Sequence, residues 1–282
     1  MKSVFVPAVL AVCLIFSSCK PGSEKELHKI PGSVLHVPTK VLTSGPKHHW
    51  FGYYDKLQFD PSGRYVLTAQ VDFEGRSPKP DDTIRVGMID LEKGNRWTEL
   101  GTSVAWGWQQ GCMLQFIPGT ASKVIWNDRQ GDQFVSHIKD ILTDEQKTLP
   151  FPIYTLSPDG RTALSVDFER INDLRPGYGY TGIPDPNREV LAPENAGLYR
   201  CDLETGEKEL IISIASMNSM PLKDSDDPTF KDFYTNKNWF NHLLFNTDGS
   251  RFVFLHRWSS PSKGRVGGFG TLMYSSDLEG KD

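Results

Sequence analysis

The fold is decided by the stretch HHWFGYYDKLQFDPSGRYVL, which runs from His48 to Leu67. Its second half places apolar residues on both sides of DPSG at 60–63, where Pro and Gly supply the fixed and the permissive backbone angles of a tight turn. The same arrangement returns at SPDG (157–160) and at NTDG (246–249), each time ahead of another apolar run. The stretch therefore predicts a β-hairpin that recurs along the chain.

A second kind of turn follows these hairpins, as DLEKG at 90–94, DLETG at 202–206 and DLEG at 277–280. Two alternating turn types divide the chain into repeats of four short strands, and a four-stranded repeat of roughly 45 residues is typical of a β-propeller blade. We therefore predict an all-β fold, a β-propeller over residues 34–282. Its four-stranded blades are expected near residues 43–100, 101–149, 150–214 and 238–282.

The N-terminus has the pattern of an export signal. Lys2 precedes an apolar run at 4–16, which is too short to span a bilayer as a mature helix and is followed by Ser17-Ser18-Cys19. Removal of a signal peptide at 1–18 would leave Cys19 able to carry lipid, as in the bacterial lipoproteins that this N-terminus resembles. Residues 19–33 would then form a polar tether. We expect a lipid-anchored protein of the bacterial cell envelope, on the periplasmic or outer-membrane surface, that touches membrane only through this anchor. An ordinary cleaved signal peptide is the alternative.

Composition and charge exclude several classes of protein. With 38% hydrophobic residues, 25 Gly and 19 Pro, the chain has material for a sizeable core and many turns, so disorder is not expected. The formal net charge of −4 gives no electrostatic footprint for nucleic acid, and no nucleic-acid partner is predicted. Cys112 and Cys201 lie in apolar strand patterns of different repeats. They are predicted to be two buried free thiols, with a disulfide as the alternative.

The two faces of such a propeller are predicted to differ. The tight turns fall on one face, whereas the other carries long connections at 72–83, 168–196, 215–241 and 258–270. Loops on a rigid scaffold carry chemistry more often than the turns that hold it together, so the functional site is expected on the second face. The segment 215–241 also fits a merely solvated insertion, because it is rich in Lys, Asp and Ser.

Polar and aromatic side chains gather where the innermost strands are expected to begin and their neighbours to end. The first innermost strand is predicted at 54–59 and the fourth at 242–245, so that His242 begins it and lies close to His256. The predicted substrate-binding residues are His48, His49, Trp50, Tyr53, Gln109, Gln110, Asn127 and Arg129. The predicted catalytic residues are Tyr54, His242, His256 and Arg257. Four of the seven histidines would thus meet at one mouth, which favours a functional pocket, although His48 and His49 could instead fix the start of the first blade.

The residue types suggest a ligand class. Aromatic rings stack on sugar faces, Gln, Asn and Arg take directed hydrogen bonds, and Arg binds carboxylates in two-point contacts, so an acidic oligosaccharide is the expected partner. The matching reaction is β-elimination, in which a base removes the proton next to a uronate carboxylate while a cation neutralises that carboxylate. Alternatively, His242 and His256 could bind a divalent metal, for which we consider manganese or calcium.

Three segments carry a resemblance to a known family: the stretch at 48–67, WQQGCMLQFIPG with VIWNDR, and NHLLFNTDGSRFVFLHRW. Together they resemble the β-propellers grouped with oligogalacturonate lyases, with ulvan lyase propellers as more distant kin, over roughly 45–282. The turn repeats alone are shared with TolB-like and peptidase-associated propellers. The resemblance implies a seven-bladed parent, export, and channel-mouth histidines that act as base and metal ligands. Only His242 and His256 lie in comparable segments, and the family's other metal-binding His and Gln residues would belong to later blades.

These features lead to one functional expectation with an alternative. The segment 34–42 resembles the outer strand that closes a last blade, so we expect the chain to be the front part of a longer product. The predicted function is an exported, lipid-anchored propeller related to polysaccharide lyases that cleave uronate-containing oligosaccharides. The alternative is a non-catalytic glycan-binding or scaffolding propeller. A peptidase accessory domain is disfavoured because the sequence contains no Gly-x-Ser-x-Gly element.

Overall fold

The computed structural model describes residues 38–222, 229–259 and 268–281 of the 282-residue chain. All described strands lie in the compact unit formed by residues 42–282. The predicted signal peptide at 1–18, the tether at 19–33 and Cys19 lie outside the described residues. None of the helices in the described ranges combines the length and the apolar character needed to cross a membrane.

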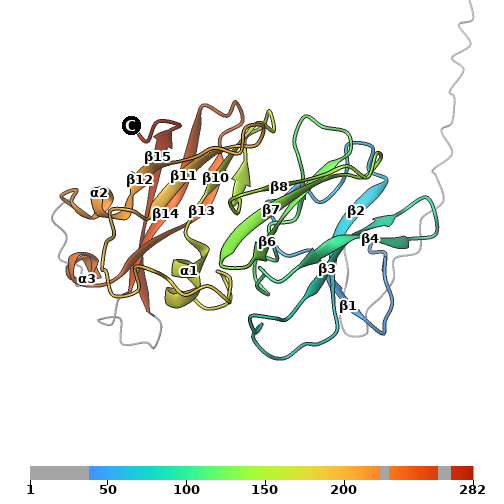
Figure 1. Ribbon diagram of the computed structural model, residues 1–282, viewed down its shortest axis with the longest axis horizontal. Coiled ribbons are helices and arrows are strands. Elements are labelled where there is room, and N and C mark those ends of the chain that lie inside the picture. The colour runs from blue at the N-terminus through green and yellow to red at the C-terminus, as the bar shows by residue number, and fades with distance from the viewer. Residues whose placement is uncertain (1–37, 223–228, 260–267, 282) are drawn as a thin grey trace, which may run out of the picture. The chain divides into compact units, whose positions relative to one another are not determined.

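Four antiparallel sheets follow one another in chain order (Figure 1). The first contains β1 (His48–Trp50), β2 (Tyr65–Val71), β3 (Ile84–Asp90) and β4 (Arg96–Ser103). The second contains β5 (Gln115–Phe116), β6 (Lys123–Gln130), β7 (Gln133–Asp140) and β8 (Gln146–Leu149). The third contains β9 (Thr155–Leu156), β10 (Thr162–Ser165), β11 (Gly197–Asp202) and β12 (Lys208–Ser213). The fourth, in the described residues, contains β13 (Asn238–Phe245), β14 (Arg251–Ser259) and β15 (Phe269–Asp277).

This arrangement confirms the predicted all-β fold, a β-propeller whose blades are small sheets of sequential antiparallel strands. The described helices are short and lie in the long connections: α1 (Phe168–Leu174), α2 (Ile214–Asn218) and α3 (Thr229–Thr235). The segment 215–241, which also fitted a solvated insertion, therefore contains helix and leads directly into β13.

The recurring hairpin turn forms as predicted, and its acidic residue explains why. The Asp60 carboxylate accepts hydrogen bonds from the backbone N–H groups of Ser62 at 3.1 Å and Tyr65 at 2.6 Å. Gly63 has φ +73°, a left-handed conformation that a residue without a Cβ adopts most readily. The turns at 157–160 and 246–249 repeat this pattern, because Asp159 accepts from Arg161 N–H at 3.1 Å and Asp248 from Ser250 N–H at 2.9 Å.

Two predicted innermost strands are wrong. In the first blade, the strand that pairs with β2 is β1 and not the predicted strand at 54–59. Within 54–59 only Phe59 forms a bridge, to Val66 of β2. The chain leaves the sheet between these pairings at Gly52, where φ is +109° and a Cβ would lie 3.0–3.2 Å from the Gln110 and Gly111 backbone, so a side chain there would be strained. In the fourth blade β13 begins at Asn238, so His242 lies inside the strand rather than at its start. Of the predicted outer strand at 34–42, the structure describes residues 38–42, and these residues are not in a strand.

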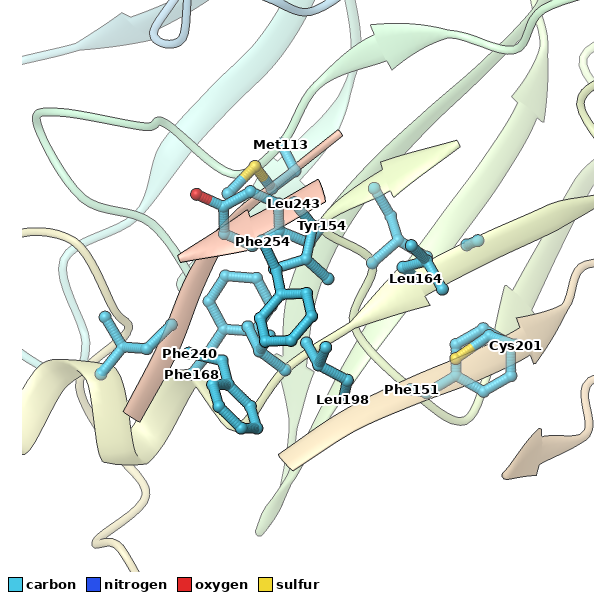
Figure 2. Close-up of a cluster of buried hydrophobic side chains, with 14 of the residues drawn as sticks. Met113, Phe151, Tyr154, Leu164, Phe168, Leu198, Cys201, Phe240, Leu243 and Phe254 are labelled. Carbon is cyan, nitrogen blue, oxygen red and sulfur yellow. The ribbon is translucent and has the colours of Figure 1, made fainter. Parts of the chain in front are cut away.

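The blades are joined by two apolar clusters. One cluster spans the first and second sheets, and the other spans the second, third and fourth. Figure 2 shows the second cluster, in which Tyr154, Phe168, Phe240 and Phe254 lie among aliphatic side chains and Cys201. Cys201, like Cys112, is a buried free thiol, as predicted, and burial raises the pKa of each to about 12.

A single buried arginine ties the long connection after α1 to the fourth blade. Arg170 is 1% exposed, and its Nη1 lies 3.0 Å from Asp185. Its Nε donates to the carbonyl oxygen of Asn238 at 2.6 Å. Nη2 donates to the carbonyl oxygens of Val190 and Leu191, each at 2.9 Å. The segment around 185–191 is therefore fixed against α1 and the start of β13.

Candidate functional site

His242 and Tyr53 meet although 189 positions separate them in the chain. His242 has φ +54° at an irregularity of β13, where the register shifts between Asn241 and Leu244. The Tyr53 hydroxyl is hydrogen-bonded to His242 Nδ1, and the two ring centroids are 5.6 Å apart. Tyr53 is only 4% exposed, so this contact joins the first and fourth blades inside the protein.

Tyr154 supports the strained backbone of His242. The Tyr154 hydroxyl accepts a hydrogen bond from the His242 backbone N–H at 3.0 Å and another from Gln110 Nε2 at 2.7 Å. Figure 2 shows this hydroxyl on the side of the ring near Met113, away from Phe168 and Leu198. The second, third and fourth blades thus converge on one polar atom, and a residue with φ > 0 is held in place.

Burial sets the protonation state of His242. It lowers the pKa of the imidazole to about 4, and the positive charge of Arg257 adds to the effect. The ring is therefore neutral at pH 7. A neutral imidazole keeps one nitrogen lone pair, which can accept a proton from a ligand.

Two arginines place excess positive charge beside this histidine. Arg257 on β14 and Arg175, directly after α1, both face the Phe269 ring, with Cζ atoms 4.7 and 4.4 Å from its centroid. Arg175 also lies 5.1 Å from the ring centroid of Tyr178, whose ring is 6.3 Å from that of His242. Burial and the charge of Arg175 lower the pKa of Arg257. Neither guanidinium has a carboxylate partner within the described ranges, and the Nε atom of each is buried without a hydrogen bond there.

A buried lysine completes the surroundings. Lys56 has a side chain only 2% exposed, and its Nζ lies 3.0 Å from Asp55 Oδ2. The ammonium group is 5.2 Å from the ring centroid of Tyr154 and 5.8 Å from that of Tyr53. Burial lowers the pKa of Lys56, while Asp55 opposes the change. Asp55 Oδ1 and Gln110 Oε1 are buried without a partner in the described part of the chain, which is typical of a site that takes water or a polar ligand.

We call this group of side chains the Tyr53–His242 site. It contains Tyr53, Asp55, Lys56, Gln110, Tyr154, Arg175, His242 and Arg257. The sequence patterns found four of these residues. The others were missed because Asp55 and Lys56 precede the true hairpin, Tyr154 fits a core strand pattern, and Arg175 lies in a long connection without periodicity.

His256 does not belong to this site, so the prediction that it shares a ligand with His242 is wrong. It is fully buried, and its Nε2 is 2.8 Å from Asn238 Oδ1. Its ring lies 4.9 Å from those of both Phe233 and Phe240, and burial lowers its pKa to about 3. The register pairs His256 with Phe240, two positions before His242, and the backbone irregularity then separates the two histidines.

The described residues do not fit a metal centre for manganese or calcium. No group of three His, Cys, Asp or Glu that could hold a metal ion occurs within 38–222, 229–259 and 268–281. Within the pair proposed as metal ligands, His256 Nε2 is hydrogen-bonded to Asn238 and His242 Nδ1 to Tyr53, and neither histidine lies in a group of three such ligands in the described ranges.

His48 and His49 lie on β1, away from the Tyr53–His242 contact. His48 Nδ1 is 3.0 Å from Glu74 Oε1, and His49 Nε2 is 2.8 Å from Gln70 Nε2 on β2. These contacts suit the alternative role of fixing the start of the first blade. Tyr54 is 85% exposed, and its ring lies 4.6 Å from that of Tyr53, beside the site.

The remaining predicted substrate-binding residues serve different purposes. Asn127 is fully buried and bonds to both the N–H and the carbonyl of Ile153, each at 2.7 Å, so its predicted contact with a ligand is wrong. Arg129 donates to the carbonyl oxygen of Pro80 at 2.8 Å and joins two long connections. Gln109 is exposed, while Trp50 packs among other tryptophans.

No protein-family model matches the chain, and no curated protein matches it. Several solved structures are similar in strand arrangement. TolB from Acinetobacter baumannii gives a TM-score of 0.45 at 11% identity, over 86% of this chain and 44% of its own. An oligogalacturonate lyase in complex with manganese gives 0.44 at 15% identity, over 83% of this chain and 68% of its own. Oligogalacturonate lyase from Vibrio parahaemolyticus gives a TM-score of 0.42 at 15% identity, over 82% of this chain and 67% of its own.

This chain therefore spans less than half of the length of that TolB. The assignment to the β-propellers comes from the strand order of the four sheets.

Proposed function

We propose that this protein is an exported, lipid-anchored propeller that cleaves uronate-containing oligosaccharides by β-elimination at the Tyr53–His242 site. The proposal is carried by two arginines, Arg175 and Arg257, that have no carboxylate partner among the described residues. Both lie beside the neutral Tyr–His pair of the site. Both residues are partly buried, and the Nε atom of each is fully so. Partial burial of a guanidinium without an anion is costly, and a uronate carboxylate is the ligand that would satisfy both.

The residues can perform the elimination without another reactant. In one tautomer, His242 Nδ1–H donates to the Tyr53 oxygen, and Nε2 has a free lone pair. Nε2 takes the proton on C5, next to the carboxylate. The electrons of the C5–H bond form a C4=C5 double bond, and the C4–O bond breaks. The Tyr53 hydroxyl gives its proton to the leaving oxygen, and the Nδ1 proton then restores Tyr53. Arg175 and Arg257 stabilise the charge that develops on the carboxylate.

The proposal is tested by following the ultraviolet absorbance of the unsaturated uronate product. Purified protein is mixed with oligogalacturonate and with ulvan oligomers, in buffers that contain manganese, calcium or a chelator. We expect product from the unaltered protein, and we expect Arg175→Gln and Arg257→Gln each to lower kcat/KM about tenfold or more, the scale of a lost charged hydrogen bond. Arg251→Gln, on the same strand as Arg257, is the matched control and should keep its activity.

Two results would contradict the lyase. If no uronate oligomer yields product, yet micromolar binding persists and survives His242→Ala, the protein is the non-catalytic glycan-binding alternative. If neither product nor binding is found with any uronate oligomer, the arginine pair serves neither uronate cleavage nor uronate binding.

The lipid anchor at Cys19 is a separate part of the proposal, supported by the apolar run that ends in Ser17-Ser18-Cys19. Cells that produce the protein are supplied with labelled palmitate, with and without globomycin. We expect label on the protein, loss of label in Cys19→Ala, and accumulation of the uncleaved form with globomycin. Cys13→Ala alters the other cysteine of the signal region and should leave the label in place. Label retained by Cys19→Ala would refute the anchor.

A further inference from the structure

A hollow of about 600 Å³ lies on the connection between β2 and β3, separate from the side chains of the Tyr53–His242 site. Its lining comes from two parts of the chain: Glu74, Gly75, Arg76 and Ser77 on that connection, and Trp108 ahead of β5. Both belong to the face that carries the long connections. Neither the core nor the chemistry described above uses this hollow.

Trp108 is held as a fixed aromatic wall. Its ring centroid lies 5.0 Å from that of Trp106, 5.2 Å from Trp50 and 5.7 Å from Phe73. Its indole Nε1–H donates to the carbonyl oxygen of Arg76 at 2.6 Å. The only polar atom of the ring is therefore occupied, and its orientation is set before any ligand arrives. Trp106 is 1% exposed and belongs to the core, whereas Trp108 is only half-buried and lines the hollow.

Charged groups border this wall, and the arginine among them is paired with a carboxylate. Arg76 pairs with both oxygens of Asp82, with Nη2 2.9 Å from Oδ1, and its Cζ lies 3.6 Å from the Phe73 ring centroid. Glu74 Oε1 is 3.0 Å from His48 Nδ1. The lining therefore offers hydrogen-bond donors and acceptors without an unpaired cation. They suit the hydroxyls of a sugar, in contrast to the unpaired arginines of the Tyr53–His242 site, which suit a carboxylate.

The hollow and the Tyr53–His242 site are joined by short stretches of chain. Trp108 is two residues before Gln110, and Trp50 is three residues before Tyr53. Even fully extended, these stretches span at most about 7 Å and about 11 Å between Cα atoms. A Cβ on Gly52 would lie 3.0–3.2 Å from the backbone of Gln110 and Gly111, so the two stretches approach each other closely at this point. One oligosaccharide can therefore reach both places.

We propose that this hollow is a sugar subsite, in which the apolar face of a pyranose residue stacks on Trp108 while Glu74, Arg76 and Ser77 bind its hydroxyls. The inference rests on the proposed function for the identity of the ligand, since it assigns to the hollow a more distant residue of the same uronate oligosaccharide. We expect affinity to depend on chain length, because a longer oligosaccharide can fill the Tyr53–His242 site and the hollow together.

The test compares the binding of digalacturonate and hexagalacturonate by isothermal titration calorimetry. Trp108→Ala is expected to lower the ratio of hexamer to dimer affinity about tenfold, as for the truncation of a buried aromatic contact. Trp108→Phe keeps an aromatic face and should recover most of that ratio. Thermal unfolding of each variant shows whether the fold is intact, and if Trp108→Ala does not fold, Ser77→Trp, which fills the hollow, should cause the same loss.

The outcomes separate this inference from the proposed lyase. An unchanged hexamer-to-dimer ratio in folded Trp108→Ala and Ser77→Trp would overturn the subsite and leave the lyase intact. If the unaltered protein binds the hexamer but makes no unsaturated product, and Trp108→Ala loses that binding, the lyase is overturned and the subsite is supported. Absence of hexamer binding by the unaltered protein would overturn both.

Discussion

His242→Ala is expected to lower the rate of uronate elimination by a factor of about 10² to 10⁴, the usual contribution of one general base. The expectation follows from geometry and protonation together. His242 is the only predicted catalytic histidine that contacts a second ionisable side chain of the site, through the hydrogen bond from Nδ1 to the Tyr53 hydroxyl. Burial and Arg257 keep the imidazole neutral at pH 7, in the form that accepts a proton.

The pH dependence of the rate has a definite sign. The neutral imidazole is the base, so kcat/KM should rise as pH increases through the His242 pKa of about 4 and then level off. An exposed histidine would place this rise near 6.5. In Arg257→Gln a positive neighbour is removed, so the pKa should increase and the acid limb should move to higher pH.

Initial rates measured from about two pH units below the His242 pKa up to about pH 8 would measure both effects. His137→Gln is the matched control, because His137 lies in the second blade against Thr148 and Asp128. His256→Gln should change stability rather than the pH profile, because His256 is buried in the fourth blade. A His242→Ala protein that is folded and within threefold of the unaltered rate would show that another group is the base.

Arg170→Met is expected to reduce the free energy of unfolding by about 3–5 kcal/mol, the scale for breaking a buried ion pair from one side. The substitution leaves Asp185 charged with a side chain 2% exposed, and it removes hydrogen bonds to the carbonyl groups of Asn238, Val190 and Leu191. The loss is greatest at Asn238, which is fully buried, because its carbonyl loses a partner where water cannot replace it.

Urea unfolding would measure the loss as a shift of the midpoint at a constant slope. Arg170→Met combined with Asp185→Leu should recover part of it, because no uncompensated charge is then buried. Arg188→Met is the matched control. The Arg188 side chain is 66% exposed and 3.2 Å from Asp173, so its loss should cost less than about 1 kcal/mol. An Arg170→Met protein as stable as Arg188→Met would contradict the proposed role.

The long connection after α1 also carries Arg175, so the two predictions are related. Arg170 fixes this connection from within the protein, and Arg175 extends from the end of the same helix toward Phe269. A weaker Arg170 anchor should therefore also loosen the position of the Arg175 guanidinium. Substrate binding by Arg170→Met, measured below its unfolding transition, should be weaker than that of Arg188→Met.

The sequence by itself determined the repeated hairpins and hence the propeller. The Asp60 turn is made by side chain and backbone groups within five positions, and the same holds at Asp159 and Asp248. Such local contacts can be read from residue type and spacing, because the permissive dihedrals of Gly and the short reach of Asp act wherever the chain places them. The burial of Cys112 and Cys201 followed from the apolar residues around them, although only Cys201 lies in a strand.

Only the tertiary structure decided the site. Tyr53 and His242 are 189 positions apart, and Tyr154 and His242 are 88 apart, so no local pattern relates them. A single irregularity in β13 sends His242 toward Tyr53 while His256 stays in the core, and a strand pattern that assumes regular alternation cannot anticipate that shift. Arg175 becomes a neighbour of Arg257 only because both contact Phe269, which requires the long connection after α1 to be fixed against the fourth blade.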